Sequence, residues 1–194
     1  MISVLHDPSL EYPDDSEAFA PSEAYPERPF PPVASRRNRV YAALRDLFHQ
    51  SGLDSSRYGT KQWNPLGEWV PRGASVFVLC NFVYHRKPQE SWQDFYSKCS
   101  HGSVLRALAD YLLIAVGPEG RVGFGNASLQ SCVWERVLEE TGAATVERFY
   151  RSVRAPVSAR DLRLWVAERS CMDLAHQRAR CSSSATSAAS IGPT

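Results

Sequence analysis

Five polar side chains in this sequence have the types and spacing expected of a site for a small molecule. Two follow the first strand-like segment, one stands at the start of an amphipathic segment, and two follow the second strand-like segment. These candidates are Asn81, His85, His101, Asn126 and Gln130. An imidazole exchanges protons near neutral pH, and amides hold a substrate by hydrogen bonds. The pattern therefore indicates acid/base chemistry by His101, with the other four residues binding the ligand.

Each of these residues also has a structural interpretation that the sequence leaves open. A histidine after a strand is more often a hydrogen-bonded or surface residue than a catalyst. Asparagine is common in turns because it tolerates unusual backbone conformations. The case for a site therefore depends on where the neighbouring elements place these side chains.

The surrounding segments alternate between strand and helix patterns. Short runs rich in Val and Phe are typical of buried strands, and apolar residues at intervals of three and four predict helices. The expected strands are 75–83, 121–125 and 156–164, and the expected helices are 38–51, 100–116, 131–141 and 144–151. This order predicts an α/β fold with a parallel-core sheet and flanking helices. The candidates then meet at the carboxyl edge of the sheet, where open α/β sheets bind ligands.

Composition divides the chain into three parts. Residues 1–34 are rich in proline and acidic residues, which predicts an extended arm that Tyr25 and Phe30 can pin to the domain surface. Residues 35–167 carry the α/β domain. Residues 168–194 are rich in Arg, Ser and Ala without an apolar period, which predicts a disordered tail.

Charge and apolar content argue against several classes of protein. The formal net charge of the 194 residues is +1, which gives no overall attraction to nucleic acid or to an anionic membrane. The longest apolar runs, 76–84 and 111–117, are far shorter than the roughly 20 residues of a membrane-spanning helix. The N-terminus lacks the basic start and apolar core of a secretory signal. We therefore expect a cytoplasmic protein that binds an unknown small molecule and has no nucleic-acid or membrane partner; its oligomeric state stays open.

Metal and cofactor sites have weak support in the sequence. The number of cysteines is odd and none are spaced as CxxC, which favours reduced thiols over a disulfide framework. Cysteines and histidines are suitable zinc ligands, but their spacing here is irregular. The residues concerned are Cys80, His85, Cys99, His101 and Cys132. We expect no metal site, no iron–sulfur cluster and no other cofactor.

One segment partly matches a dinucleotide-binding fingerprint. Gly123-Phe-Gly125-Asn-Ala-Ser128 follows an expected strand, with serine in place of the last glycine. An acidic residue about 20 positions further on would be needed to bind the ribose, and Asp161 lies too far along the chain. This distance disfavours a nucleotide site. The helix expected from Ser131 can hold an anion without the fingerprint.

Five short segments together resemble a known family. They are Tyr25–Phe30, Tyr58–Trp69, Asn81–Val83, Ser100–Tyr111 and Leu129–Cys132. In this order they are similar to the bacterial domain-of-unknown-function family numbered 362, over about residues 20–163. The Trp-Asn-Pro-Leu-Gly loop and the His-Gly-Ser-Val helix start are the specific parts. Some members are fused to ferredoxin-like iron–sulfur modules, but the family supplies no reaction that can be carried over.

The chain departs from the family pattern at both strand ends. It has Leu79-Cys80-Asn81 where the family typically has Lys-Pro-Asn, and Gly125-Asn126-Ala127-Ser128 where the family has Gly-Asp-Ala-Pro. The ferredoxin-like cysteine run is absent, and members usually continue further. The resemblance therefore implies a shortened chain with an incomplete sheet, in which Leu79 and Asn126 replace a charged pair facing one crevice.

Three functions remain compatible with these observations. The first is a small-molecule enzyme that uses His101 as acid/base, and the second is a binding module without turnover. The third is a truncated or impaired member of the family, with a damaged site for a small anionic molecule. The two neutral residues at the strand ends favour the third function over the first.

The cofactor prediction can be tested directly. Purified protein should contain no iron–sulfur cluster and no stoichiometric zinc, because the thiolate ligands are too few and badly spaced. Elemental analysis by mass spectrometry measures the metal content per chain. About one metal ion per chain that disappears in Cys80→Ala or Cys132→Ala would contradict the prediction.

Overall fold

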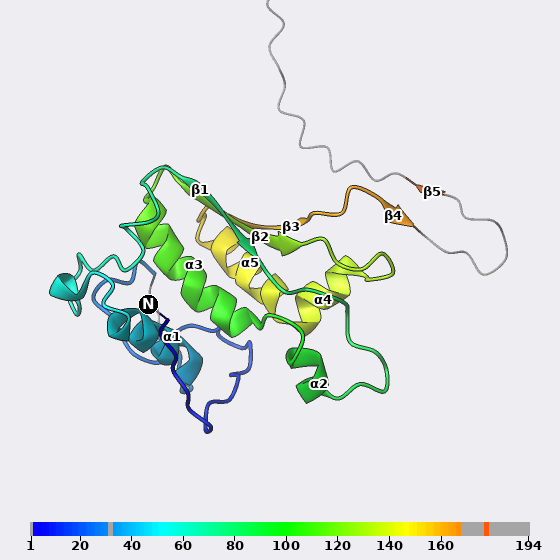
Figure 1. The fold of residues 1–194 in the computed structure, drawn as a ribbon, viewed down its shortest axis with the longest axis horizontal. Coiled ribbons are helices and arrows are strands. Elements are labelled where there is room, and N and C mark those ends of the chain that lie inside the picture. Colours follow the sequence, from blue (N-terminus) through cyan, green and yellow to red (C-terminus); the bar gives the residue numbers. More distant parts are fainter. Residues whose placement is uncertain (1, 31–32, 168–176, 179–194) are drawn as a thin grey trace, which may run out of the picture.

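The computed structural model describes residues 2–30, 33–167 and 177–178. Helices and strands alternate in it as the sequence predicts (Figure 1). The elements are α1 (Arg39–Gln50), the 3₁₀ turn η1 (Ser55–Arg57), β1 (Ser75–Leu79), α2 (Trp92–Tyr96), α3 (Gly102–Val116), β2 (Arg121–Asn126), α4 (Trp134–Glu140), α5 (Ala143–Ser152), β3 (Val157–Asp161), β4 (Val166–Ala167) and β5 (Gln177–Arg178). None of the described helices combines the length and apolarity needed to cross a membrane.

The main sheet is parallel, with β2 between β1 and β3. Ser75–Leu79 pairs with Arg121–Gly125, and Val122–Asn126 pairs with Val157–Asp161. This arrangement confirms the predicted α/β fold with a parallel-core sheet. The short strands β4 and β5 form a separate antiparallel pair.

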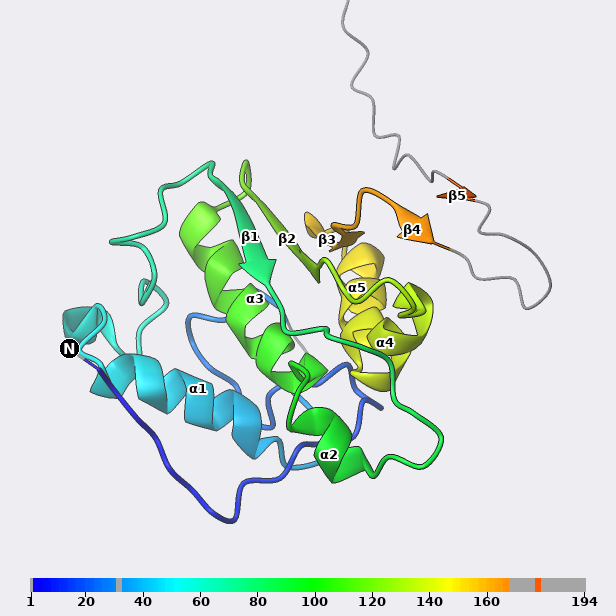
Figure 2. The same cartoon turned by 45° about the vertical axis from the view of Figure 1, so that its right-hand side comes forward.

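All the helices lie on one side of the main sheet (Figures 1 and 2). Helices α3 and α5 pack against the strands, and α1 packs on the far side of α3. This sandwiched position explains why α3 is apolar around most of its circumference and why most of its residues are buried. On β2, Val122 and Phe124 point toward the helices and are buried.

The opposite surface of the sheet, which we call the open face, has no described helix over it. Side chains alternate between the two faces of a strand, so every second residue belongs to this surface. It consists of Ser75, Phe77 and Leu79 on β1, Arg121, Gly123 and Gly125 on β2, and Ser158 and Arg160 on β3. The same alternation of exposure continues beyond β3 through Leu162 and Leu164.

Some element boundaries differ from the sequence-based expectation. Strand β1 ends at Leu79 instead of residue 83, because Phe82 turns to pair with Cys99 in an isolated antiparallel bridge. Helix α2 was not predicted; it has five residues, too few to show an apolar period. Of the predicted tail, residues 168–176 and 179–194 lie outside the described residues.

The N-terminal arm is part of the core. Phe19 and Glu27 are buried, and the ring of Tyr25 stacks on Tyr41 of α1. Phe30 makes edge-to-face contacts with two aromatic rings of α5, Phe149 and Tyr150. The predicted boundary after residue 34 therefore separates segments that share one packed interior.

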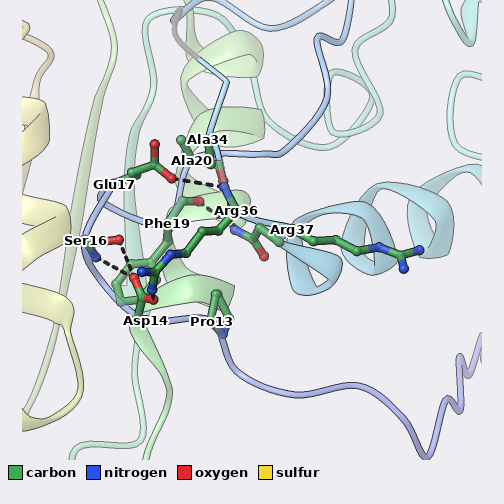
Figure 3. Close-up of a pocket in the computed structure, with 10 residues that line it drawn as sticks. Pro13, Asp14, Ser16, Glu17, Phe19, Ala20, Ala34, Arg36 and Arg37 are labelled. Atoms are coloured by element: carbon green, nitrogen blue, oxygen red, sulfur yellow. Dashed lines mark hydrogen bonds and ion pairs between the residues drawn. The ribbon is translucent and has the colours of Figure 1, made fainter.

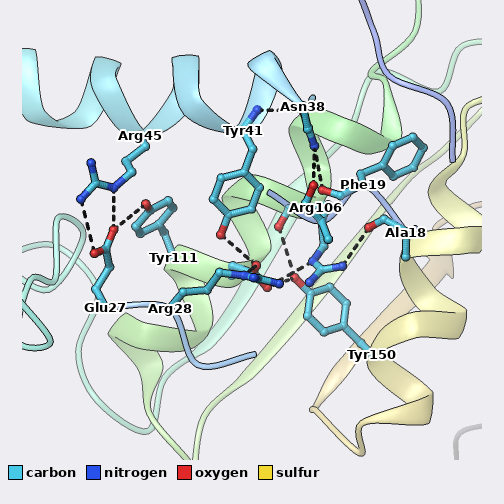
Figure 4. Close-up of polar contacts among 12 residues, drawn as sticks. Ala18, Phe19, Glu27, Arg28, Asn38, Tyr41, Arg45, Arg106, Tyr111 and Tyr150 are labelled. Atoms are coloured by element: carbon cyan, nitrogen blue, oxygen red, sulfur yellow. Dashed lines mark hydrogen bonds and ion pairs between the residues drawn. The ribbon is translucent and has the colours of Figure 1, made fainter. Parts of the chain in front are cut away.

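A buried carboxylate on α3 joins the arm to three helices. Asp110 Oδ2 accepts hydrogen bonds from Tyr41 Oη at 2.8 Å and Arg28 Nε at 3.5 Å. Its Oδ1 accepts from Tyr150 Oη at 2.6 Å and Arg106 Nε at 3.3 Å. Figure 4 shows these donors converging from α1, the arm, α5 and α3. Burial, followed by the charge of Asp110, raises the pKa of Tyr41 and Tyr150 well above the ordinary value, so both stay protonated donors.

A second buried ion pair fixes the arm to α1. Arg45 Nε donates to Glu27 Oε1 at 2.7 Å, and Tyr111 Oη donates to the same oxygen at 3.0 Å (Figure 4). The Arg45 guanidinium lies 4.4 Å from the ring centroids of both Tyr25 and Tyr58, which surround it with cation–π contacts. The charge of Arg45 is thus neutralised and covered entirely by the chain itself.

Removing the carboxylate of Asp110 should lower the denaturant concentration at which the protein unfolds. Asp110→Asn leaves Arg106 as an uncompensated charge in the core, so we expect a loss of about 3–5 kcal/mol in the free energy of unfolding. Glu139→Gln is the matched control, because the Glu139–Arg148 pair is exposed and such pairs contribute about 0–1 kcal/mol. Urea unfolding followed by circular dichroism measures both variants. Equal losses in the two variants would show that Asp110 does not hold the core together.

Candidate functional site

The carboxyl edge of the sheet is where the sequence places the site. Strands β1 and β2 end there, and α3 and α5 begin there because they return antiparallel to the strands. The arm crosses this edge: the Tyr12 ring stacks on His101, and Asp15 Oδ2 accepts a hydrogen bond from Thr145 Oγ1 in the first turn of α5 at 2.8 Å. The N-terminal segment therefore covers the starts of α3 and α5 at this edge, while Leu79 and Asn81 at the end of β1 are exposed.

His101 is the N-cap of α3. Its Nδ1 accepts the backbone N–H of Ser103 at 3.2 Å, and Ser103 Oγ lies 2.9 Å from the same nitrogen. The ring is 5% exposed and packs between Tyr12, at a centroid distance of 4.1 Å, and the edges of Phe19 and Tyr96. Burial lowers the pKa of His101 to about 4, and the carboxylate of Asp15 offsets part of this effect. The imidazole is thus neutral at pH 7 and forms the helix cap.

Asn81 connects the end of β1 to the segment that leads into α3. Its Nδ2 donates to Lys98 O at 2.8 Å, and its backbone N–H donates to Ser100 Oγ at 2.9 Å. Ser100 returns a backbone hydrogen bond to Asn81 O at 3.0 Å. These bonds close the loop between residues 81 and 100, which is a structural use of the asparagine.

His85 contacts a different part of the chain from His101. Its Nδ1 accepts the backbone N–H of Val133 at 3.0 Å, and its ring stacks on Tyr84. Burial, then the nearby Arg136, lowers the pKa of His85. The half-buried imidazole therefore fixes the loop that precedes α4.

Asn126 and Gln130 lie near Arg163, a residue that the sequence analysis did not single out. Asn126 pairs with Asp161 across β2 and β3. Arg163 donates to Asp161 Oδ1 at 2.9 Å and to the carbonyls of Leu129, Gln130 and Cys132 at 3.2, 3.4 and 2.9 Å. The arginine thus holds the loop after β2 against the end of β3. The spacing Asp161-x-Arg163 was the available signal, because residues two apart in an extended segment lie on one side.

The expected charged-pair positions do not face one crevice. Leu79 pairs with Gly125, so both lie on the open face, whereas Asn126 is the next residue and points toward the helices. The hypothesis that these two substitutions damaged a shared crevice is therefore wrong for this geometry. Leu79 is instead an exposed apolar residue on the open face.

The two strand glycines have steric roles. A Cβ atom at Gly125 would lie 1.9 Å from the carbonyl oxygen of Arg160, and one at Gly123 would lie 2.8 Å from Cδ2 of Phe77. Gly125 therefore requires glycine, because its neighbour is backbone, whereas at Gly123 the exposed Phe77 ring would have to shift. Helix α4 begins at Trp134, eight positions after β2 ends, so the fingerprint-like glycines do not lead directly into a helix.

Three thiols lie buried in this region. Cys80, Cys99 and Cys132 are free and buried, and burial raises the pKa of Cys80 to about 11. Among the described residues, no group of three His, Cys, Asp or Glu side chains is placed to hold a metal ion. The other two cysteines lie outside the described residues.

Three hollows on the described part of the chain lie along the arm, and none of the five candidates lines them. A cavity of about 120 Å³ between the arm and the start of α1 is lined by Asp14, Glu17 and Arg36 among others (Figure 3). Asp14 is ion-paired with Arg36 there, and Glu17 accepts the backbone N–H of Ser35 at 2.9 Å. Asp14, Glu17 and Arg36 are therefore engaged by the chain itself, while Arg37 also lines this cavity.

Comparison with known protein families, with curated proteins and with solved structures gives no match for this chain. The resemblance noted from the sequence therefore stays a prediction.

The lowered pKa of His101 predicts a pH-dependent stability. Because the folded pKa of about 4 lies below the ordinary 6.5, the unfolded state binds the proton first. The neutral His101 contributes fully to the free energy of unfolding above about pH 6.5. This contribution is lost as the pH falls toward 4, by roughly 2–3 kcal/mol at pH 4.5. Urea unfolding at pH 7.5 and pH 4.5 should show this loss in the wild type. His101→Asn, which keeps a cap acceptor, should lack it.

His85→Asn is the matched control and should still lose unfolding free energy between pH 7.5 and pH 4.5, because His101 is unchanged in this variant. The imidazole proton signals in nuclear magnetic resonance give an independent measurement. A His101 titration midpoint above pH 6 would show that the ring is solvated and available for proton transfer.

Proposed function

We propose that this chain is a binding module without catalytic activity, which holds another protein on the open face of its sheet. The observation that carries the proposal is the exposure of apolar side chains on this face. Leu79 is 71% exposed and Phe77 is 40% exposed, although both lie on a strand of the main sheet. Leu164 and Trp165, directly beyond β3, are 81% and 63% exposed.

A cluster of this kind is uncommon on a protein surface that binds nothing. Single exposed apolar residues are ordinary, whereas contiguous apolar patches commonly mark interaction sites. In α/β folds with parallel sheets, both faces are normally covered. The open face departs from this rule, and the uncovered residues include the three leucines Leu79, Leu162 and Leu164.

The polar residues at the carboxyl edge support the absence of catalysis. His101 is neutral, buried and bonded as a helix cap, and Asn81 and His85 are bonded to backbone groups. A general acid or base must reach its substrate within hydrogen-bond distance. Tyr12 and Phe19 pack on the His101 ring and limit such access. An enzyme using His101, and an anionic small-molecule site at this edge, therefore receive less support than protein binding.

We also infer that the chain is a relative of the family numbered 362, in the cytoplasm. The segments that resemble the family have structural uses here: Glu27 and Arg28 form buried ion pairs, Trp63 is fully buried, and His101 caps α3. Buried contacts of this kind constrain residue type strongly. They support a shared fold and do not bear on a shared reaction.

Peptide selection tests the proposed function. Random peptides of about 18 residues displayed on phage are selected on the full chain, and the retained peptides are synthesised. Leu79→Ser with Leu164→Ser should weaken their binding at least tenfold, because each buried leucine contributes about 1.5–3 kcal/mol. Isothermal titration calorimetry measures the dissociation constants.

Val104→Ser, on an exposed position of α3, is the matched control and should leave binding unchanged. If the selected peptides bind the double variant and the wild type equally, the open face is not the binding surface.

A further inference from the structure

We propose that the partner presents an acidic amphipathic helix, which lies along β2 on the open face; this inference rests on the proposed function. The dimensions of the sheet fit a helix. Neighbouring strands are about 4.8 Å apart, so β1 and β3 are separated by roughly 10 Å, close to the diameter of an α-helix. On the open face the central strand has glycines at two positions; the Phe77 ring lies against Gly123, and Gly125 is buried beside the backbone of Arg160, so a helix would rest on these neighbours.

The side chains around these glycines give the helix an apolar contact. Phe77 lies against Gly123, with its ring covering the strand, and Leu79 stands beside Gly125. Leu162 and Leu164 extend the apolar surface beyond the end of β3. A helix with leucines at intervals of three and four residues would bury these side chains against its own stripe.

The charges on the open face favour a partner with negatively charged side chains. Arg121 and Arg160 are its two charged residues, and no acidic residue occurs among the eight strand residues that define the face. Gly125 pairs with Arg160, so the two arginines lie about four positions apart along the sheet, or roughly 13 Å. Acidic side chains two helical turns apart, about 11 Å, match this separation. Neither arginine has a carboxylate partner among the ion pairs of the described chain.

This charge pattern disfavours other occupants. A second copy of the chain would bring two arginines of one open face against two of the other, and like charges across an interface are unfavourable. A single-stranded nucleic acid needs aromatic rings for stacking along its length. Phe77 and, beyond β3, Trp165 are the exposed aromatic residues here, too few to stack bases along a strand, and leucines form most of the remaining apolar surface.

Two synthetic helical peptides test the inference. Both carry the same leucine stripe over 18 residues; one has glutamates beside the stripe and the other has lysines. The full chain should bind the acidic peptide at least tenfold more tightly at low salt. The difference should shrink at 0.5 M salt, because exposed charges are screened over about 4–5 Å there. Arg121→Glu with Arg160→Glu should reverse the preference. Arg151→Glu, an exposed arginine on α5, should leave it unchanged.

The outcomes separate this inference from the proposed function. Equal binding of both peptides, abolished by Leu79→Ser, would overturn the acidic partner and leave protein binding on the open face intact. If neither peptide binds, the acidic helical partner is also overturned. The phage selection tests protein binding on the open face independently of this result. Tighter binding of oligouridine, lost in Phe77→Ala, would indicate a nucleic acid instead. A dimer in analytical ultracentrifugation, lost in Leu79→Ser, would indicate a second copy. Either result overturns the proposal.

Discussion

The buried carboxylate of Asp110 is the constraint around which the helices and the arm are arranged. It lies on α3, the helix between the sheet and α1, and it is bonded to donors from the arm, α1, α3 and α5. A charge in the interior is tolerated when it is paired and fully hydrogen-bonded, and becomes very costly when a partner is removed. Each of these elements must therefore hold its position for the core to exist.

The same demand explains why the arm belongs to the domain. Ala18 and Phe19 have left-handed backbone conformations, with φ of 48° and 56°, which cost roughly 1–2 kcal/mol each for residues other than glycine. Arg106 Nη1 donates to Ala18 O at 2.8 Å, and Phe19 packs against Gly102 and Gly142. The contacts made by the arm offset this strain. They also carry the arm across the carboxyl edge, where it covers the ring of His101.

The molecule thus has a heavily cross-bonded side and an open side. On the helix side, ion pairs and aromatic contacts surround the buried charges, including the cage of Tyr25 and Tyr58 around Arg45. On the open side, β1 exposes Leu79 and Phe77 to solvent. Exposed apolar side chains on paired strands are suited to docking, because the strand pairing already holds their backbone in place when a partner binds.

The sequence by itself determined the element order and the parallel α/β class. Apolar spacing identified α1, α3, α5 and the strands, since burial of one helix face or strand face leaves a local pattern. It could not show that α2 exists, because five residues are shorter than an apolar period that can be recognised. It also could not place the strand ends, because the turn at Cys80 and the contacts of Arg163 depend on partners far along the chain.

The tertiary structure decided what the candidate residues do. His101 has the residue type of a catalyst, but its burial by Tyr12 and Phe19, about 80–90 positions earlier in the chain, makes it a neutral helix cap. Leu79 and Asn126 are near in topology, yet the pairing register places them on opposite faces. The burial of a side chain, its protonation state and the sheet face to which it points all depend on contacts between distant segments. A linear pattern records which residues are available for such contacts, and the fold alone selects which contacts form.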